Sequence, residues 1–397
     1  MMIYSSTDNA YMARALRLAR RGYDTTHPNP RVGCVLVRAG QIVGEGWHER
    51  AGQPHAEVHA LRMAGEAARG ATAYVTLEPC CHYGRTPPCS RALLDAGVQR
   101  VVMAMRDPDR RVAGQGIAEL QAAGVSVECG LLETEARTLN PGFVMRAEQG
   151  RPWVRCKLAM SVDGRTALAS GASQWLTDTP ARLDVQQLRA SSSAVLTGIG
   201  TLLADDPALN VRLPETERQP LRVILDPELA TPPQAHTLSL PGQVLILTTV
   251  TDAQRQIALE RRGAKVQRLP PAPGGLDLAA VMAELARREI NEVHTECGPI
   301  LAGALLQAGL LDELVIYMAP VLLGHTARGL VHLPELASMQ QRRTLTISDI
   351  RAVGRDWRIT AHPISGVTLT RPSNPDRPRP RLDCAADARS ASVQRDQ

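Results

Sequence analysis

The hydrophobic positions of the first 150 residues repeat with a helical period in some segments and a strand period in others. Met12 and Leu16 recur on one face between Asp8 and Arg21, which predicts a helix capped by Asp8 and ended by Gly22. The following segments are predicted as strands at 31–37, 41–47, 71–79 and 100–105 and as helices at 55–65, 89–98 and 116–125. Strands that alternate with helices predict a sheet covered by helices, which is an α/β domain.

A second series of alternating segments begins at residue 151. It opens with the segment 151–167, and its other predicted strands are 193–198, 221–226, 243–249, 292–296 and 313–320. The last segment, 366–397, is rich in Pro, Arg, Ser and Asp and has little to bury, so we expect a disordered tail. The sequence therefore predicts two α/β domains, 1–150 and 151–365, followed by this tail.

Composition and charge argue against several classes of protein. A net charge of +5 over 397 residues and a single Phe do not suggest binding to nucleic acid. The N-terminus lacks the features of a signal peptide, and no apolar run reaches the roughly 18 residues that a membrane helix needs. We therefore expect a cytoplasmic protein without nucleic-acid or membrane partners, whose clustered cysteines bind metal rather than form disulfides.

Two motifs in the first domain carry donors for a metal ion. His55-Ala56-Glu57 opens a predicted helix, and Pro79-Cys80 is followed by Cys89 within the stretch EPCCHYGRTPPC. H-x-E followed by P-C-x-x-C is typical of zinc nucleobase deaminases. One imidazole and two thiolates leave a fourth position on zinc for water, and a nearby carboxylate can carry a proton from it to the leaving amine. We expect His55, Cys80 and Cys89 to bind one catalytic zinc ion and Glu57 to carry the proton.

Other ligand sets stay open at this point. Cys81 neighbours Cys80, but both reach one ion only if the chain folds back sharply. His59 lies four residues after His55 on the same helix face, which makes a rival histidine pair. A purely structural zinc would need a closed set of four ligands, and Glu57 would then be an ordinary helix residue.

The second domain offers weaker signals. Gly198 and Gly200 have no third glycine at the spacing of a dinucleotide-binding fingerprint. Gly298-Pro299 follows a predicted strand and begins a helix, whose free N–H groups can bind a phosphate. Lys157 is one of only two lysines, with Lys265, in a chain that otherwise uses Arg. Since Arg cannot replace an ammonium group that must share a proton, Lys157 is a candidate for the chemistry.

At these residues the chain resembles a known family. HPNPRVGCVLV, HAEVHAL and EPCCHYGRTPPC are similar to the deaminase half of the bifunctional pyrimidine deaminase/reductase family of riboflavin biosynthesis. The wide spacing before PPC separates that family from the deaminases of cytidine and of tRNA adenosine. LNPGF, KLAMSVDGRTA, SQWLT, TGIGTLLADDPALNVR and ECGPILAGALL resemble the reductase half in the same order. The resemblance covers about residues 8 to 363.

The resemblance implies a fold and two reactions. The expected fold is a cytidine-deaminase-like three-layer α/β/α domain followed by a dihydrofolate-reductase-like α/β domain. The first domain, with one zinc ion, would deaminate 2,5-diamino-6-ribosylamino-4(3H)-pyrimidinone 5′-phosphate by hydrolysis. The second would use NADPH to reduce the ribosyl group to ribityl, which gives 5-amino-6-ribitylamino-uracil 5′-phosphate. A homo-oligomer, a dimer or a tetramer, is expected by the same resemblance.

The resemblance also implies roles for single residues. Lys157 would hydrogen-bond the sugar while hydride reaches its carbon, and Asp163 is expected to form a turn rather than act as an acid. The residues expected at NADPH are Ala159, Trp175, Thr201, Asp205, Gly298, Pro299, Ile300, Leu301, Ala302, Gly303 and Ala304. Those expected at the substrate are Asn29 in the deaminase and Ser173, Arg189, Leu209, Arg212 and Glu296 in the reductase. Arg189 and Arg212 suit a phosphate dianion through their forked donors.

One segment departs from the family, and two rival functions remain. Asp109-Arg110-Arg111 stands where the family usually has Asn-Pro, which puts the contact of this loop with substrate in doubt. A nucleic-acid-editing deaminase would need a basic groove with aromatic residues, which the sequence lacks. A scaffold stabilised by zinc would unfold without the metal and would not need Glu57.

Overall fold

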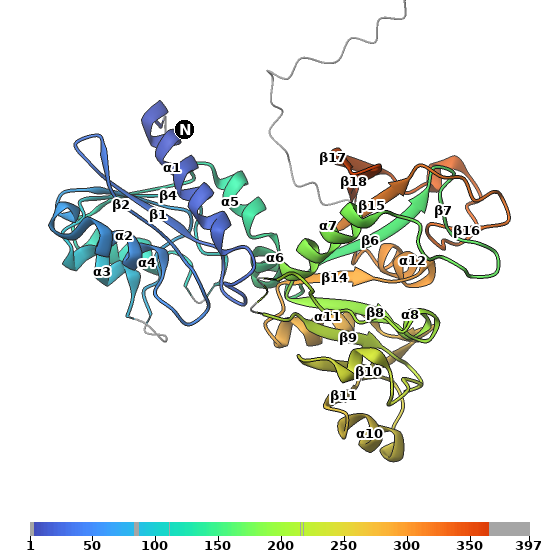
Figure 1. Cartoon of the computed structure of the whole chain (residues 1–397). Helices are drawn as coiled ribbons and strands as arrows, with labels where there is room; N and C mark the ends of the chain where they lie inside the picture. The colour runs from blue at the N-terminus through green and yellow to red at the C-terminus, as the bar shows by residue number, and fades with distance from the viewer. Residues whose placement is uncertain (1–3, 83–86, 111, 215, 217, 365–397) are drawn as a thin grey trace, which may run out of the picture. The chain divides into compact units, whose positions relative to one another are not determined.

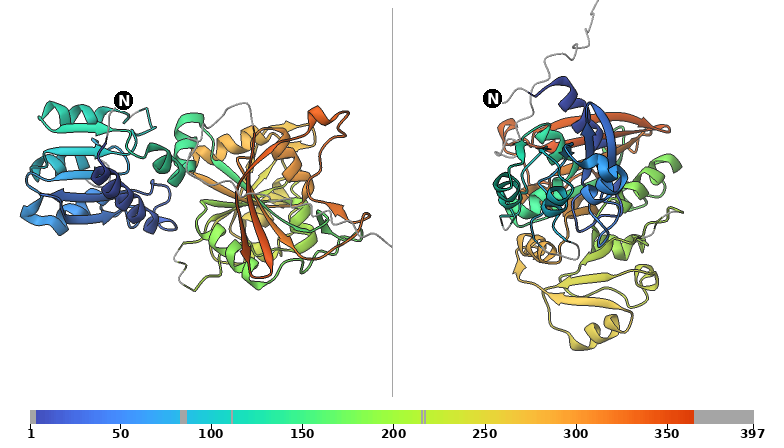
Figure 2. Two further views of the ribbon diagram at one scale, coloured as in Figure 1. Left: turned by 90° about the horizontal axis from the view of Figure 1, so that it is seen from above. Right: turned by 90° about the vertical axis from the view of Figure 1, so that its left-hand side faces the viewer.

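The computed structural model describes residues 4–82, 87–110, 112–214, 216 and 218–364. The tail predicted at 366–397, the motif residues 83–86 and Arg111 lie outside the described residues. Two sheets, of five and nine strands, organise the described chain, and they share no strand (Figures 1 and 2).

The five-stranded sheet has the order β2-β1-β3-β4-β5. Strand β1 pairs antiparallel with β2 and with β3, and β3, β4 and β5 are parallel. The strands are β1 (Gly33–Arg38), β2 (Gln41–Trp47), β3 (Thr72–Val75), β4 (Arg100–Met103) and β5 (Ser126–Cys129). The turn between β1 and β2 falls at Ala39-Gly40, where both residues have a positive φ, as a tight hairpin requires.

Helices cover both faces of this sheet. Helices α1, α5 and α6 pack on one face around a core that includes Met12, Val35 and Val102, and α2, α3 and α4 pack on the other around Leu36 and Val101. The helices are α1 (Ser6–Ala19), α2 (Ala56–Ala64), α3 (Cys89–Asp95), α4 (Gln115–Ala122), α5 (Glu133–Leu139) and α6 (Pro141–Gln149), with short 3₁₀ turns at Arg20–Gly22 and Gly65–Ala68. The predicted three-layer α/β/α arrangement is confirmed.

Several local predictions need correction. The first helix is capped by Ser5, not Asp8, because the Ser5 hydroxyl accepts the backbone N–H of Asp8 and the Asp8 carboxylate accepts the backbone N–H of Ser5. This reciprocal pair is a capping box, which moves the cap back by three residues, from Asp8 to Ser5. The strand predicted at 71–79 ends at Val75, and the residues after it form a loop. Strand β5 and helices α5 and α6 were not predicted from the sequence.

The nine-stranded sheet has the order β11-β10-β9-β8-β14-β6-β15-β18-β17. The first seven strands are parallel, and β18 and β17 continue the sheet antiparallel. The strands are β6 (Trp153–Ser161), β8 (Ala194–Gly198), β9 (Leu221–Leu225), β10 (Val244–Thr248), β11 (Ala264–Arg268), β14 (Glu292–Glu296), β15 (Glu313–Ala319), β17 (Leu345–Val353) and β18 (Asp356–Pro363). Two short ribbons pair β12 (Pro271–Ala272) with β13 (Gly275–Leu276) and β7 (Arg165–Ala167) with β16 (Arg328–Gly329).

The helices of this part also lie on both faces of their sheet. Helices α11 and α12 pack on the face that carries Val223 and Leu245, whereas α8, α9 and α10 pack on the face that carries Ile224 and Ile246. Helix α7 covers Val315 and Tyr317 on this second face. The helices are α7 (Thr179–Ala190), α8 (Ile199–Asp205), α9 (His236–Ser239), α10 (Ala253–Glu260), α11 (Leu278–Arg287) and α12 (Pro299–Gln307), and a 3₁₀ turn spans Met339–Gln341. Figure 1 shows α10 beside the yellow strands β10 and β11 at one end of the sheet.

The chain changes direction between β8 and β14. These strands are parallel neighbours, but the helix after β8 packs on one face of the sheet and the helix after β14 packs on the other. Such a change of direction leaves a crevice at the carboxyl ends of the strands, where α/β proteins bind their ligands. The fold therefore points to this edge as the binding site of the second sheet.

Within the described residues, no helix is long and apolar enough to cross a membrane.

Candidate active sites

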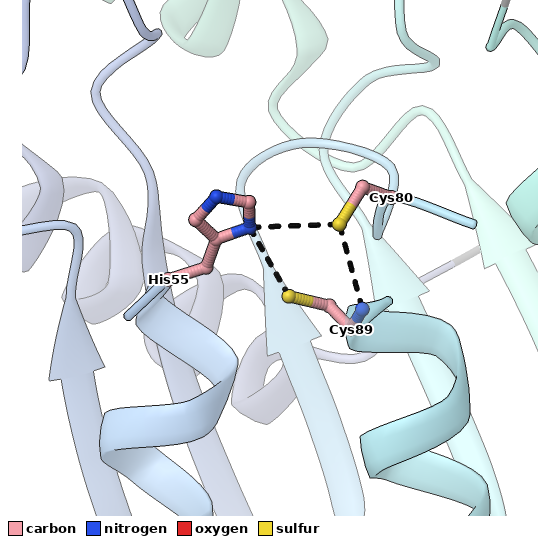
Figure 3. A group of neighbouring side chains, drawn as sticks. All are labelled: His55, Cys80 and Cys89. Carbon is pink, nitrogen blue, oxygen red and sulfur yellow. Dashed lines mark hydrogen bonds between the residues drawn. The ribbon is translucent and has the colours of Figure 1, made fainter. Parts of the chain in front are cut away.

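The first candidate site lies between the starts of two helices in the first domain. His55 is the N-cap of α2, and Cys89, directly after Pro88, is the first residue of α3. Cys80 lies in the loop that follows β3, and this loop is held to α3 because the Ser90 backbone N–H and hydroxyl both donate to the Cys80 carbonyl, at 3.1 and 3.2 Å. The predicted helix starts at His55 and Cys89 are thus confirmed, and they aim both residues at Cys80 (Figure 3).

The three side chains converge on a small volume. His55 Nδ1 lies 3.5 Å from Cys80 Sγ and 3.3 Å from Cys89 Sγ, and the ligand atoms of the three residues all lie within 4.8 Å of one another. Figure 3 shows the imidazole and both sulfur atoms pointing toward one another. One nitrogen and two sulfur donors at this spacing fit tetrahedral zinc with one position left over.

The electrostatics of the cluster favour a thiolate. Hydrogen bonding by Cys89 and by His55 lowers the pKa of Cys80 to about 4, and the Cys89 backbone N–H also donates to its sulfur at 3.4 Å. The resulting negative charge raises the pKa of His55 and that of Cys89. A negative charge shared by two sulfurs beside an imidazole is the state that binds a divalent cation, because zinc takes the place of the shared protons.

Glu57 lies two residues beyond His55 and is almost completely buried, at 3% exposure. Burial, together with the charge on Cys80, raises the pKa of its carboxyl to about 6. Its Oε2 atom is buried and has no hydrogen-bond partner among the described residues. A carboxyl with a pKa near neutral and a free oxygen is suited to accept and release a proton.

The alternative ligands do not join this cluster. The Cys81 thiol points to Gln115, with its sulfur 3.7 Å from Oε1 of that residue. His59 is not in the group of converging donors, because it lies one turn along α2 from the helix start that faces the two sulfurs. Among the described residues the structure therefore favours the set of His55, Cys80 and Cys89.

His48 is a neighbour of this site that the sequence analysis missed. Its Nδ1 lies 3.2 Å from the Pro54 carbonyl, so Nδ1 carries the proton, and Nε2 accepts from the Asn29 amide at 3.1 Å. The His48 ring also meets the His55 ring edge-on at 5.2 Å between centroids. Burial lowers the pKa of His48, which keeps the ring neutral. A single histidine at the end of a predicted strand gave no signal of this role.

Glu78 is a second residue that the sequence did not reveal. Its buried carboxylate accepts four backbone N–H groups at 2.9 to 3.2 Å, from Asp107, Gly114, Gly116 and Ile117. The last two belong to the first turn of α4, where a negative charge is favourable. Glu78 thus ties the segment 107–117 to the loop that carries Cys80.

The second candidate site lies at the carboxyl edge of β8 and β14. Gly298 is the N-cap of α12, and Pro299 is its first residue, as predicted. The Gly298 backbone N–H donates to the Thr201 hydroxyl at 3.2 Å, which joins the turn after β14 to the helix after β8. No atom lies within 4 Å of where a Cβ on Gly200 would stand, so the backbone is open there. The two turns can accommodate a dinucleotide phosphate at the start of α12.

A row of charged side chains crosses the sheet face under α7. Lys157 on β6 is paired in register with Glu296 on β14, and both lie on the face opposite the apolar core. Arg189 of α7 donates to the Glu296 carboxylate through Nε at 2.5 Å and Nη2 at 2.9 Å. Although burial raises the pKa of Glu296, Arg189 outweighs it and holds that pKa well below its usual value. Burial lowers the pKa of Lys157, whose ammonium lies 5.9 Å from the centre of the Tyr317 ring.

The remaining residues expected in the reductase differ in how well they join this site. Arg189 also donates to the Asn210 carbonyl at 2.8 Å, and the Arg212 guanidinium donates to the Asn210 side chain at 3.0 Å. Burial and the Arg189 charge lower the pKa of Arg212, so the two guanidinium groups are neighbours. Leu209 directly precedes Asn210 in the chain and is buried with a positive φ of 55°.

Four expected contacts lie at the surface or give no polar contact. Trp175 is 72% exposed and stacks on Arg182 at 4.9 Å, and Ile300 is 73% exposed on α12. Asp205 ends α8 at the surface, and Ser173 is half-buried before a cis peptide between Gln174 and Trp175. Their exposure leaves them accessible to a ligand, but nothing in their surroundings identifies one.

Asp163 does more than the predicted turn. Gly164 has a positive φ of 72°, as a turn requires. The Asp163 carboxylate also accepts the backbone N–H groups of Leu323 and Gly324, the latter at 2.7 Å, and it accepts the Ser161 hydroxyl. The Ser161 hydroxyl bond and these backbone bonds lower the pKa of Asp163 to about 2. The residue therefore joins the turn after β6 to the loop after β15.

Comparison with known proteins agrees with both halves of the chain. Residues 5–105 match the family described as the cytidine and deoxycytidylate deaminase zinc-binding region, and residues 152–359 match the RibD C-terminal domain. The riboflavin biosynthesis protein RibD of Escherichia coli is 52% identical over 361 residues, which are 88% of this chain and 97% of that protein.

Solved structures give the same result over most of the chain. The RibD of Acinetobacter baumannii is similar with a TM-score of 0.85 and 45% identity, covering 90% of this chain and 99% of that one. A diaminohydroxyphosphoribosylaminopyrimidine deaminase/5-amino-6-(5-phosphoribosylamino)uracil reductase from Thermotoga maritima is similar with a TM-score of 0.79 and 31% identity, with the same coverage of 90% and 99%.

Fold, site and comparisons together define a class of protein. A cytidine-deaminase-like α/β/α domain with a zinc-binding cluster is followed by a reductase domain of the dihydrofolate-reductase-like fold. The protein is thus a bifunctional enzyme, a zinc-dependent deaminase joined to an NADPH-dependent reductase. It belongs to the RibD family of riboflavin biosynthesis proteins.

Proposed function

We propose that this enzyme deaminates 2,5-diamino-6-ribosylamino-4(3H)-pyrimidinone 5′-phosphate and then reduces the ribosyl group of the product to ribityl. The observation that carries the proposal is the convergence of His55, Cys80 and Cys89 beside the buried Glu57, in a chain whose second sheet holds Lys157 against Glu296. The names of the relatives support the choice of substrate. We assign the deaminase to residues 1–150 and the reductase to residues 151–365.

In the deaminase, each residue of the cluster has a separate task. His55, Cys80 and Cys89 would hold zinc, which, when bound, would lower the pKa of a water molecule for the hydrolysis. Glu57 accepts a proton and passes it to the amine that leaves as ammonia, a role that its free, buried oxygen supports. Asn29 contacts the pyrimidine, and the Asn29 bond to His48 fixes the orientation of its amide.

In the reductase, different residues around the crevice between β8 and β14 would bind the cofactor, contact the sugar and bind the phosphate. NADPH at the start of α12 and beside Thr201 would supply the hydride. The Lys157 ammonium donates a hydrogen bond to the sugar, and Glu296 holds the ammonium near it by opposite charge. Arg189 and Arg212, which share Asn210, bind the phosphate with forked donors.

Two further properties belong to this proposal. We propose a homo-oligomer, a dimer or a tetramer, because β17 ends the nine-stranded sheet with Ile347 and Ile350 more than half exposed. Exposed apolar edge strands are sites where another chain adds. We propose action in the cytoplasm, because a cluster with free thiols needs a reducing compartment, and the described cysteines are all free. Sedimentation and cell fractionation test these two statements.

The decisive experiment follows both reactions in one sample. Ammonia release and NADPH oxidation are measured with the diamino pyrimidine ribose phosphate, for the wild type and for Glu57→Gln. We expect the wild type to do both, and the variant to lose about 10²- to 10⁴-fold of the deamination while it still oxidises NADPH with the deaminated compound. A wild-type protein that binds zinc but releases no ammonia would contradict the deaminase, and ammonia without NADPH oxidation would contradict the reductase.

A further inference from the structure

His294 is a buried histidine beside the reductase site to which the mechanism above gives no task. It lies in the middle of β14, two residues before Glu296, and its side chain is completely buried. Neither ring nitrogen has a hydrogen bond of good geometry among the described residues. An unsatisfied polar group in a protein interior is unfavourable, so a buried ring of this kind calls for an explanation.

The nearest acceptor for the ring is the carboxylate of Glu296. His294 Nε2 lies 3.3 Å from Glu296 Oε1, the same oxygen that accepts from Nε of Arg189. A carboxylate oxygen has two lone pairs, so it can accept from both groups. A proton on Nε2 sets an N–H against the negative oxygen, whereas a proton on Nδ1 would set a lone pair against it. The position of Glu296 therefore selects the Nε2–H tautomer.

The surroundings of His294 show from which side its ring contacts the Glu296 carboxylate. Side chains alternate along β14, so Glu292, His294 and Glu296 share the face under α7, while Val293 lies in the apolar core on the other face. Glu296 is the last residue of the strand and its side chain is 16% exposed, whereas His294 lies deeper. The imidazole therefore contacts Glu296 from the interior, and the substrate reaches it from the strand end.

This arrangement matters because Arg189 would bind both the Glu296 carboxylate and the phosphate of the substrate. In the free site Arg189 binds Glu296 with two hydrogen bonds, yet the phosphate of the substrate would draw on the same guanidinium. When Arg189 turns to a phosphate, the histidine N–H is the partner that keeps the carboxylate in place. We propose that His294 is a positioning residue of the reductase, which holds Glu296 for the sugar from the interior of the sheet. The inference rests on the reductase site proposed above.

Charged groups on each side of the ring decide how pH acts on it. Arg155 on β6 is opposite His294 in register and pairs with Glu313 at 3.0 Å and with Glu292 at 3.7 Å. Arg189 of α7 and Lys157 of β6 lie on the Glu296 side, and β8 presents the neutral Val195. Burial lowers the pKa of His294, and the Glu296 charge opposes that effect only in part. The ring is therefore neutral at physiological pH, and on acidification a charged His294 competes with Arg189 for Glu296.

The test compares His294→Gln and His294→Leu in the full-length enzyme. A glutamine amide can still donate to Glu296 but does not titrate, whereas leucine does neither. Thr295→Val is the matched control, because Thr295 is the next residue, is equally buried and points to the opposite face. Reductase kcat and KM for the deaminated substrate are measured against pH, and ammonia release in the same samples monitors folding.

We expect His294→Leu to raise the reductase KM about five- to tenfold, the effect of losing one polar contact of ordinary net strength with the Glu296 carboxylate, with a smaller change in kcat. His294→Gln should stay within about threefold of the wild type. Protonation of His294 should lower wild-type kcat/KM only at a pH below the ordinary histidine pKa of about 6.5, because burial lowers the pKa of this ring, and this acid limb should weaken in His294→Gln. Thr295→Val should match the wild type throughout.

Two results would overturn the proposal. The first is an unchanged KM in His294→Leu. The second is an equal loss in both histidine variants with the same pH profile as the wild type, which would mean that the ring serves only as packing. Glu296→Gln reports on the site itself: if it leaves reduction unchanged, the proposed reductase site fails, and the role of His294 fails with it. If Glu296→Gln impairs reduction and His294→Leu does not, only the role of His294 is wrong.

Discussion

The two catalytic regions of this enzyme differ in how many elements contribute to them and in how their charges are balanced. The deaminase cluster brings its three candidate ligands from two helix starts and one loop, and the chemistry proposed for it is concentrated in His55, Cys80, Cys89 and Glu57. The reductase site spreads over β6, β14 and α7, where Lys157, Glu296 and Arg189 belong to a larger set of buried charges. In the first region a metal would balance the negative donors, and in the second the protein supplies charges of both signs.

This difference has an energetic consequence. Thiolates beside a zinc ion need no protein cation, so the deaminase site can be small and made of local motifs. Buried carboxylates and guanidinium groups are stable only if each has a partner, so the reductase site needs long-range pairing across several elements. Substitutions in the deaminase cluster should therefore abolish deamination almost completely. Substitutions in the row of charged side chains should instead lower the rate of reduction by different amounts.

The largest expected effect distinguishes a cysteine of the proposed zinc cluster from a cysteine outside it. Cys89→Ala removes one of three ligands, so we expect loss of zinc and of ammonia release by at least about 10³-fold, with reduction retained. Cys81→Ala is the matched control, because its thiol points to Gln115 and should leave zinc content near that of the wild type. Metal analysis and both activity assays check this. Loss of zinc in Cys81→Ala but not in Cys89→Ala would reverse the ligand assignment.

The second-largest expected effect tests whether the reductase site needs the hydrogen-bond geometry of Arg189 or only its positive charge. Arg189→Lys keeps the charge but cannot reproduce the two parallel bonds to Glu296, so we expect reductase kcat/KM to fall about 10- to 100-fold. Arg288→Lys is the control, since Arg288 pairs with Glu284 at 2.6 Å on α11, away from the site. Steady-state kinetics with the deaminated substrate measure both variants. An equal effect of the two substitutions would mean that stability, not the site, is affected.

A pH profile of the reduction tests the role of Lys157. Burial lowers the pKa of Lys157 below the usual 10.5, so its ammonium is lost as the pH rises through that lowered value. The reduction, which uses the charged form, should decline on the alkaline side at a lower pH than an exposed lysine would predict. In Lys157→Arg the residual reduction should show no such decline, because arginine does not titrate there. The same alkaline limb in wild type and variant would assign it to another group.

The smallest expected effect on catalysis is a stability effect in the deaminase. Glu78→Gln places an amide NH₂ against backbone N–H donors, so we expect the free energy of unfolding of this half to fall by about 1–3 kcal/mol. Reduction by the other half should not change. Thermal unfolding followed with both activities measures this, and Glu119→Gln, at a partly buried residue that accepts the Ser90 hydroxyl, is the milder control. An unchanged unfolding temperature would show that the four N–H groups find other partners.

The deaminase cluster could be predicted from sequence because its information is local. His55 and Glu57 lie in one turn, and Cys80 and Cys89 are nine positions apart, so helix starts and one loop determine most of their geometry. The first helix shows the limit of this reasoning: both Ser5 and Asp8 suit a cap, and only their reciprocal hydrogen bonds decide between them. Alternation of strands and helices likewise predicted two α/β domains.

The charged row of the reductase depended on the tertiary structure. Arg155 and Lys157 become neighbours of His294 and Glu296 because β14 pairs with β6, and the hydrophobic periodicity of a single segment does not indicate which strands will pair. The four-fold contact of Glu78 and the bond from Asn29 to His48 arise in the same way, from backbone and side chains brought together over long sequence separations. Sequence alone determined which residues could perform the chemistry at the cluster. The pairing of parallel strands decided which charges are buried together, because each such charge needs a partner that only the folded sheet supplies.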